Sequence, residues 1–272
     1  MKEICHKGLA RLVGTLGSMP LEPEDLKNVI DGSIDPDNLN KQRMNENLIN
    51  TLTISFEWLL EHTIHAKELA IKSINEACEA RKRNNGIWGR FLGWAFHFIT
   101  DWGTPYHSFK SKSNPLPSSA KIGTGSGAII GGIGGLIKSL TKRDTDFREI
   151  ISDGFKGAGI GAVVGTGIGV GIGGAALAIS HGKFETRCDE LWDEYYSSIE
   201  EKFEIEIKNQ EVLNITIDLF ENKMNSLRQL CESLPADWIF TCNREEYADY
   251  MIKIALTMDL ACQVIANQKI NE

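Results

Sequence analysis

Residues 93–107 read Gly93-Trp-Ala-Phe-His97-Phe-Ile-Thr-Asp101-Trp-Gly-Thr-Pro-Tyr-His107, an apolar segment that carries histidine and aspartate. The segment is expected to be helical, and on a helix residues four apart, such as His97 and Asp101, project from one face a turn apart. An imidazole and a carboxylate placed in this way can bind one metal ion. The Gly103-Thr-Pro105 break predicts that the helix ends and that His107 turns away to serve the same ion or a neighbouring one.

A second histidine and acid, His181 and Glu185, repeat this four-residue spacing. A buried His–Asp pair without a metal would also explain His97 and Asp101, because a histidine in an apolar helix needs a polar partner. Two such pairs, with His107 between them, favour the metal interpretation.

Apolar residues recur at helical spacing over most of the chain, which predicts an all-α protein. The sequence has no alternating strand pattern and no nucleotide-binding glycine loop. Further helices are expected over residues 4–17, from about residue 20 to the acidic turn at 31–37, over 45–83 as one helix or two, and over 204–232 and 245–267.

The composition is that of an ordinary globular protein. The chain has 272 residues, of which 42% are hydrophobic, enough for the core of one large or two small domains. Its net charge of −8 argues against a binder of double-stranded nucleic acid, because such proteins need a positive surface to displace counterions from phosphates. The six cysteines form no CxxC motif, and the N-terminal residues lack the apolar run of a signal peptide, so we expect a cytoplasmic protein with reduced thiols.

Residues 111–180 differ from the rest in composition and hold most of the glycines. Glycine recurs there every four residues in two series: Gly123, Gly127, Gly131 and Gly135, then Gly157, Gly161, Gly165, Gly169 and Gly173. On a helix each series lines one face, against which a second helix can pack closely. The uncharged segments 122–137 and 157–180 are 16 and 24 residues long, and about 20 apolar residues span a bilayer.

These features predict a glycine-rich helical hairpin that contacts a membrane through residues 122–180 and can join copies of the chain into a homo-oligomer. A hairpin packed on the soluble body, or an irregular loop, is the alternative, because glycine costs about 1 kcal/mol per residue inside a helix. The expected organisation is a helical domain in two parts, residues 1–110 and 181–272, with an insertion at 111–180. The cytoplasmic protein would then associate with membranes through this insertion.

Candidate ligands also lie outside the central segment. His6 stands near the start of the first expected helix, Asp31 begins the acidic turn at 31–37, and His62 and His65 share one expected helix. Carboxylates in such a turn usually cap helices in solvent, but oxygen-rich loops also bind metals. Residues three apart neighbour each other on a helix, so one of the two histidines can point into a site while the other faces solvent.

The pattern His97-xxx-Asp101-xxxxx-His107, followed by His181-xxx-Glu185, resembles the zinc-dependent phospholipase C family. That family has an all-helical fold, which it shares with fungal single-strand nucleases. Both the spacing of the central block and its Asp-xxx-Pro-x-His context match the family.

The resemblance implies two or three zinc ions held by eight residues: His6, Asp31, His65, His97, Asp101, His107, His181 and Glu185. The His-xxx-Asp pair would bind the first ion, and the three ligands from His107 onward would bind the second. Asp31 would be the bridging aspartate and the catalytic base, and His6 would serve the third ion. His62 stays open as the alternative to His65.

Three departures from the family affect this expectation. The histidine expected between Asp31 and His97 is not in the family's usual context, and His65 or His62 is the available substitute. Met1 stands where the family has an N-terminal tryptophan, so the third zinc site is expected to be altered or empty. The glycine-rich segment is an insertion between His107 and His181 that the common family pattern lacks. The resemblance covers about residues 1–110 and 181–200.

The activity implied by the resemblance is that of a phosphodiesterase that hydrolyses a phospholipid headgroup, with a zinc-bound hydroxide as the nucleophile. The glycine-rich segment would bring the site to the bilayer surface. A single-strand nuclease of the same fold is the nearest alternative. A non-catalytic membrane protein in which a metal only stabilises the helical body is the other.

Overall fold

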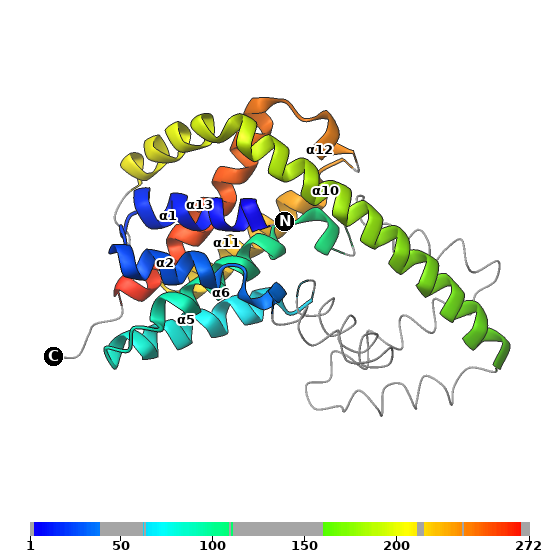
Figure 1. Cartoon of the computed structure of the whole chain (residues 1–272), viewed down its shortest axis with the longest axis horizontal. Helices are drawn as coiled ribbons and strands as arrows, with labels where there is room; N and C mark the ends of the chain where they lie inside the picture. Colours follow the sequence, from blue (N-terminus) through cyan, green and yellow to red (C-terminus); the bar gives the residue numbers. More distant parts are fainter. Residues whose placement is uncertain are drawn as a thin grey trace. The chain divides into compact units, whose positions relative to one another are not determined.

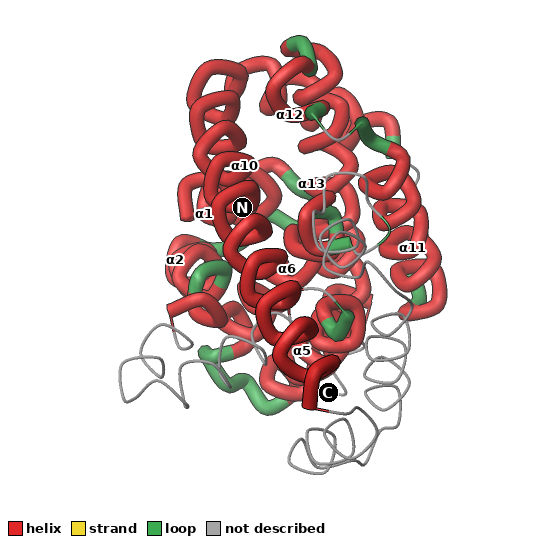
Figure 2. The backbone as a smooth tube through the Cα atoms, turned by 90° about the vertical axis from the view of Figure 1, so that its right-hand side faces the viewer, coloured by secondary structure: helices red, strands yellow, loops and turns green. Residues whose placement is uncertain are grey.

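The computed structural model describes residues 3–38, 62, 64–108, 110, 160–210, 215–235 and 237–267, and only the backbone of residues 160–181. Throughout this part of the chain the structure consists of helices and connecting loops, without a strand (Figure 2). The expected all-α fold is therefore confirmed for the described residues.

The helices follow one another along the chain as coloured in Figure 1. In order they are α1 (Glu3–Leu16), α2 (Pro23–Gly32), α5 (Ala66–Lys82), α6 (Trp88–Trp102), the 3-10 helix η1 (Pro105–His107), α10 (Ile160–Asn209), α11 (Ile217–Ser233), α12 (Trp238–Thr241) and α13 (Arg244–Asn267).

The chain divides into two compact units, Met1–Ser113 with Lys183–Glu272, and Asn114–Gly182. The insertion expected at residues 111–180 covers nearly the same residues as the second unit. Within that unit the structure describes residues 160–182, which are helical and continue into the rest of α10.

Helix α6 lies at the centre of the first unit, where it contacts α1, α2, α5, α11 and α13. Three of its large apolar side chains, Leu92, Phe96 and Ile99, are fully buried. A helix that is apolar on nearly every face needs neighbours on every side. The same surroundings bury three polar residues of α6, His97, Thr100 and Asp101.

Helices α2 and α6 cross closely because each has a glycine at the crossing. A Cβ atom on Gly93 would lie 2.8 Å from Gly32 Cα, and one on Gly32 would lie 2.4 Å from the Arg90 carbonyl oxygen. Any side chain at these positions would force the helices apart, so the close approach depends on glycine. The approach brings Ser33, which follows α2, alongside His97.

Helix α6 ends at the Gly103-Thr-Pro105 break, as expected from the sequence. The Thr104 N–H donates to the Asp101 carbonyl oxygen (2.9 Å), and the Thr104 backbone then becomes extended, with φ −83° and ψ 123°. Proline suits the first position of a helix and here begins η1. His107 ends η1, so it has left the direction of α6.

The single helix expected over residues 204–232 is wrong. Helix α10 ends at Asn209 and α11 begins at Ile217. Thr216 caps α11, because its Oγ1 accepts a hydrogen bond from the Leu219 N–H (3.3 Å). Threonine is a preferred N-cap residue, and this signal in the sequence could have located the break.

Parts of the expected organisation lie outside the described residues. Only the second half of the helix expected at 45–83 is described, as α5. The first glycine series and residues 122–159 of the expected membrane segment are likewise not described. Within the described part of the chain, no helix is both long and apolar enough to cross a membrane.

Candidate metal centre

Six side chains converge beside the C-terminal half of α6: His6, Asp37, His62, His97, Asp101 and His107. Two overlapping groups of three have ligand atoms that all lie within 4.8 Å of one another, namely His6 with Asp37 and His97, and His62 with His97 and Asp101. Asp37 is partly exposed, and the other five residues are buried. Imidazoles and carboxylates gathered at such distances can hold divalent metal ions.

His97 is fixed by the carbonyl group of Ser33. Its Nδ1 lies 2.9 Å from that oxygen, which can only accept a hydrogen bond, so Nδ1 carries a proton and donates it. Its Nε2 lies 3.1 Å from Asp101 Oδ2 and 3.3 Å from His62 Nδ1. Metal-binding histidines usually have one nitrogen fixed in this way, which directs the other nitrogen to the ion.

The carboxylate of Asp101 lies between two pairs of histidines. Its Oδ2 contacts His62 Nδ1 and His97 Nε2. Its Oδ1 lies 3.5 Å from His107 Nδ1 and 3.9 Å from His6 Nε2. Each carboxylate oxygen of Asp101 therefore faces a different pair of histidines.

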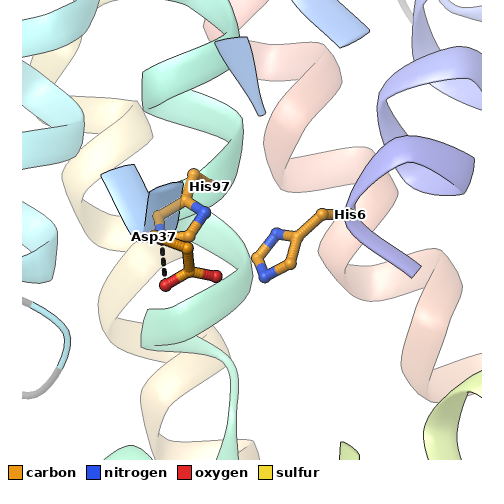
Figure 3. Close-up of side chains that lie close together, drawn as sticks. All are labelled: His6, Asp37 and His97. Atoms are coloured by element: carbon orange, nitrogen blue, oxygen red, sulfur yellow. Dashed lines mark ion pairs between the residues drawn. The ribbon is translucent and has the colours of Figure 1, made fainter. Parts of the chain in front are cut away.

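Asp37 reaches the cluster from the chain that follows α2. Its Oδ1 lies 3.8 Å from His62 Nε2 and 3.9 Å from His97 Nε2, the second of these contacts being the dashed line in Figure 3. The Asp37 side chain is 26% exposed, whereas that of Asp101 is 2% exposed. Asp37 is therefore the carboxylate of the cluster that is open to solvent.

Helix α6 holds the segment that presents this carboxylate, residues 33–38, which we name the Asp37 turn although residues 35–38 are helical. Asp35 accepts hydrogen bonds from the Arg90 guanidinium group and from Trp94 Nε1, the latter at 3.0 Å. Both donors lie on α6, upstream of His97. The bond from His97 to the Ser33 carbonyl group ties the start of the same turn.

His6 enters the cluster from α1 and is 1% exposed. Its ring stacks on that of His97, with the centroids 4.5 Å apart, and points toward Asp37 and His97 in Figure 3. Neither ring nitrogen has a hydrogen-bond partner among the described residues. A buried polar group without a partner costs about 1–3 kcal/mol, and coordination of a metal ion would satisfy it. The donor set therefore fits a metal.

The carboxylates of the cluster favour a positive charge on His97. Burial alone would lower the pKa of His97, but the carboxylates of Asp101 and Asp37 outweigh it and raise this pKa to about 9. Burial would raise the pKa of Asp101, but His97 and His62 outweigh it and hold this pKa well below the usual range. Burial, followed by the charge on His97, lowers the pKa of His6 well below its ordinary value, which leaves the neutral imidazole that a metal requires.

Two of the expected ligands are replaced by near neighbours. The Asp31 side chain is exposed near the end of α2, and Asp37, six residues later, takes its place in the cluster. The buried face of α2 packs on α6 through Val29 and Gly32, which leaves Asp31 on the solvent side. The sequence shows that residues 31–37 are acidic. Which of these carboxylates points into the cluster depends on the course of the backbone after α2.

Of the two neighbouring histidines, the structure brings His62 to the cluster. His62 is 1% exposed and belongs to the cluster, whereas His65 is partly exposed and precedes the first residue of α5. One of the two was expected to point inward and the other toward solvent. Among the described residues, the inward histidine is His62.

The last two expected ligands belong to α10. His181 lies in this helix, but its side chain is outside the described part of the chain. Glu185 follows one turn later and is partly buried; it is in neither of the two groups of three. Its neighbour Phe184 packs against Tyr106, which precedes His107, with ring centroids 5.0 Å apart. This contact brings the Glu185 region of α10 next to η1.

Comparisons with family models, with curated proteins and with solved structures found no match to this chain.

Proposed function

We propose that the chain is a metal-dependent phosphodiesterase that hydrolyses phospholipid headgroups at a cluster of at least two zinc ions. The observation that carries the proposal is the position of Asp101, whose two carboxylate oxygens face different pairs of histidines. A structural zinc site is usually one closed set of four ligands. A central carboxylate with histidines on both sides instead suits two closely spaced ions, as in hydrolases that cleave phosphodiesters.

The two sides of Asp101 define the proposed ligand sets. On the Oδ2 side the first ion would be held by His62, His97, Asp101 and Asp37. On the Oδ1 side the next ion would be held by Asp101 and His107, and by His181 and Glu185 according to the family resemblance. His6, which groups with Asp37 and His97, would serve a further ion. Compared with the ligands expected from the sequence, Asp37 and His62 replace Asp31 and His65.

When bound, the ions would neutralise charge that develops on a phosphodiester and make a bound water more acidic. The side chains of the protein have separate proposed roles in holding the site and in proton transfer. Asp101 and His97 are buried and fixed, so they hold the arrangement. Asp37 is the solvent-accessible carboxylate, and we assign to it the acceptance of a proton from the attacking water, the role that the resemblance gave to Asp31.

The choice of a phospholipid as substrate rests on the sequence. The net charge of −8 is unfavourable for a long polyanion, which normally binds to a positive surface. The glycine-rich segment, residues 122–180, would supply the contact with the lipid surface. This segment also distinguishes the proposal from a nuclease of similar architecture.

The first experiment is to load the purified full chain with zinc, count the ions, and assay two substrates side by side. We expect two or more ions per chain and release of the headgroup from short-chain phosphatidylcholine. Cleavage of single-stranded DNA, without cleavage of the lipid, would show that the protein is the alternative single-strand nuclease. Bound zinc with neither activity would leave a non-catalytic metal protein.

A matched pair of carboxylates tests the assignment of the base. Asp37→Asn, assayed at a zinc concentration that keeps its metal content equal to that of the wild type, should lower the rate by about 10²–10⁴-fold, the usual contribution of general acid–base catalysis. Asp31→Asn, on the exposed face of α2, should leave rate and metal content unchanged. Full activity in Asp37→Asn, or loss of activity in Asp31→Asn, would remove Asp37 from this role.

A further inference from the structure

The turn that carries His107 is held by helices from the far end of the chain. We name residues 102–108 the His107 turn. Three side chains of α11 and α13 bind its polar groups: Arg228, Glu232 and Tyr250. In the opposite direction the Trp102 Nε1 donates to the Met224 carbonyl oxygen of α11 (2.8 Å).

Arg228 makes the most extensive of these contacts. Its guanidinium group donates from Nη1 to the Trp102 carbonyl oxygen at 3.0 Å and from Nη2 to the His107 carbonyl oxygen at 2.7 Å. It also stacks on the Trp102 ring, 4.4 Å from the centroid. One rigid, planar group thus joins the last residue of α6 to the last residue of η1. The distance across the Gly103-Thr-Pro105 break is thereby fixed.

Glu232 contacts both Arg228 and the His107 turn. Glu232 lies one turn after Arg228 on α11, and its Oε1 is 3.5 Å from Arg228 Nε. The same oxygen accepts a hydrogen bond from Ser108 Oγ at 2.5 Å. The Arg228 side chain is 12% exposed, so its hydrogen bonds are largely protected from competition with water.

We propose that Arg228 is a positioning residue for the metal centre: it holds the backbone of His107 so that the imidazole faces Asp101 Oδ1. The inference rests on the proposed function only in requiring that His107 binds a metal. Six residues after His107 the first compact unit gives way to the second, at Ser113 and Asn114. The contacts of Arg228 would keep the imidazole aligned with Asp101, independently of any movement of the inserted unit.

The chain offers a matched control for Arg228. Arg81 also donates from Nη1 to a backbone carbonyl oxygen, that of Ile265 (3.1 Å), and also lies over a tryptophan ring, that of Trp88 (5.4 Å). It ties α5 to α13 and contacts no residue of the candidate metal centre. Replacing Arg81 should therefore weaken the fold in a comparable way without moving a ligand.

The test compares zinc content, zinc affinity and melting temperature in the full-length wild type, Arg228→Met, Arg228→Lys and Arg81→Met. We expect Arg228→Met to weaken one site by about 10–100-fold, as is typical when a residue that orients a ligand is removed, with the other site intact. Arg228→Lys should also weaken it, because an ammonium group cannot bridge both carbonyl groups while stacking on the ring. Arg81→Met should lower the melting temperature only.

A double-mutant comparison shows whether Arg228 acts through His107. In the His107→Ala background the change Arg228→Met should cause no further loss of zinc affinity. Wild-type affinity at both sites in Arg228→Met or Arg228→Lys would overturn the inference while leaving the metal centre intact. If Arg81→Met weakened zinc binding as much as Arg228→Met does, Arg228 would be a residue that stabilises the fold in general and not a positioning residue. A wild type that binds no zinc would overturn the proposed function first and this inference with it.

Discussion

The Asp37 turn and the His107 turn flank the same helix but are held in different ways. The Asp37 turn is tied to α6 itself, through Arg90 and Trp94, which lie 55 and 59 residues from Asp35 in sequence. The His107 turn is tied to α11, where Arg228 lies 126 residues from Trp102. The first side of the proposed metal centre therefore depends on helices near the N-terminus. The position of His107 depends on the C-terminal helices, which follow the insertion.

The largest effect is expected from the residue that both sides share. Asp101→Ala removes the central carboxylate and leaves four buried histidines around the gap, so we expect zinc to fall below one ion per chain and hydrolysis to fall to background. Elemental analysis and the lipid assay measure the two losses. The exposed Asp193 on α10 provides a control, since Asp193→Ala should change neither. An active Asp101→Ala protein would refute the central role of this residue.

A smaller effect, on the affinity of the first ion only, is expected from a change in the Asp37 turn. Asp35→Ala removes the acceptor of the Arg90 and Trp94 hydrogen bonds, so Asp37 should lose its fixed position. We expect the affinity of the first ion to fall by about 10–100-fold while the second ion is retained. A zinc titration that resolves the two sites measures this, and equal weakening of both sites would show that the two turns are not independent.

A still smaller effect is expected from a contact of α13 with the His107 turn. The Tyr250 hydroxyl group is buried and donates to the Gly103 carbonyl oxygen. Tyr250→Phe should reduce the free energy of unfolding by about 1–2 kcal/mol, because the buried carbonyl group loses a donor. Thermal or denaturant unfolding measures this change. Tyr196→Phe, which removes only a contact with Glu200 on the same helix, should cost less than half as much.

The smallest effect on the metal centre is expected from the insertion. Replacing residues 115–180 by a short linker should leave zinc content and hydrolysis of short-chain lipid unchanged. Sedimentation with phospholipid vesicles should then show reduced binding, because the proposed membrane contact is gone. Unchanged vesicle binding would remove the glycine-rich segment from this role, and loss of zinc would show that it supports the metal centre.

The all-α fold and the central block could be predicted because their signals are local. Helical periodicity identified α6, and the four-residue spacing of His97 and Asp101 placed both on one face of it. The glycine and proline after Asp101 correctly predicted the end of the helix. These features depend on residues within one or two turns of one another.

The choice between neighbouring candidate ligands could not be predicted from such local signals in the sequence. The sequence places Asp31 and Asp37 in one acidic turn, whereas in the structure Asp31 lies in α2 and Asp37 follows it. What separates them is the packing of α2 against α6 and the hydrogen bonds that Asp35 makes with Arg90 and Trp94. The role inferred for Arg228 is less predictable still. An arginine on an amphipathic helix is ordinarily a solvated residue, and only the tertiary structure brings it to the His107 carbonyl group.

The most direct test of the account is X-ray absorption at the zinc edge on the zinc-loaded full-length protein. Because Asp101 is proposed to bridge two ions, the spectrum should contain zinc–zinc scattering at about 3.5–4 Å together with imidazole and oxygen ligands. This scattering should disappear in Asp101→Ala. A wild-type spectrum of isolated four-coordinate zinc, without a second metal within that distance, would contradict the central claim.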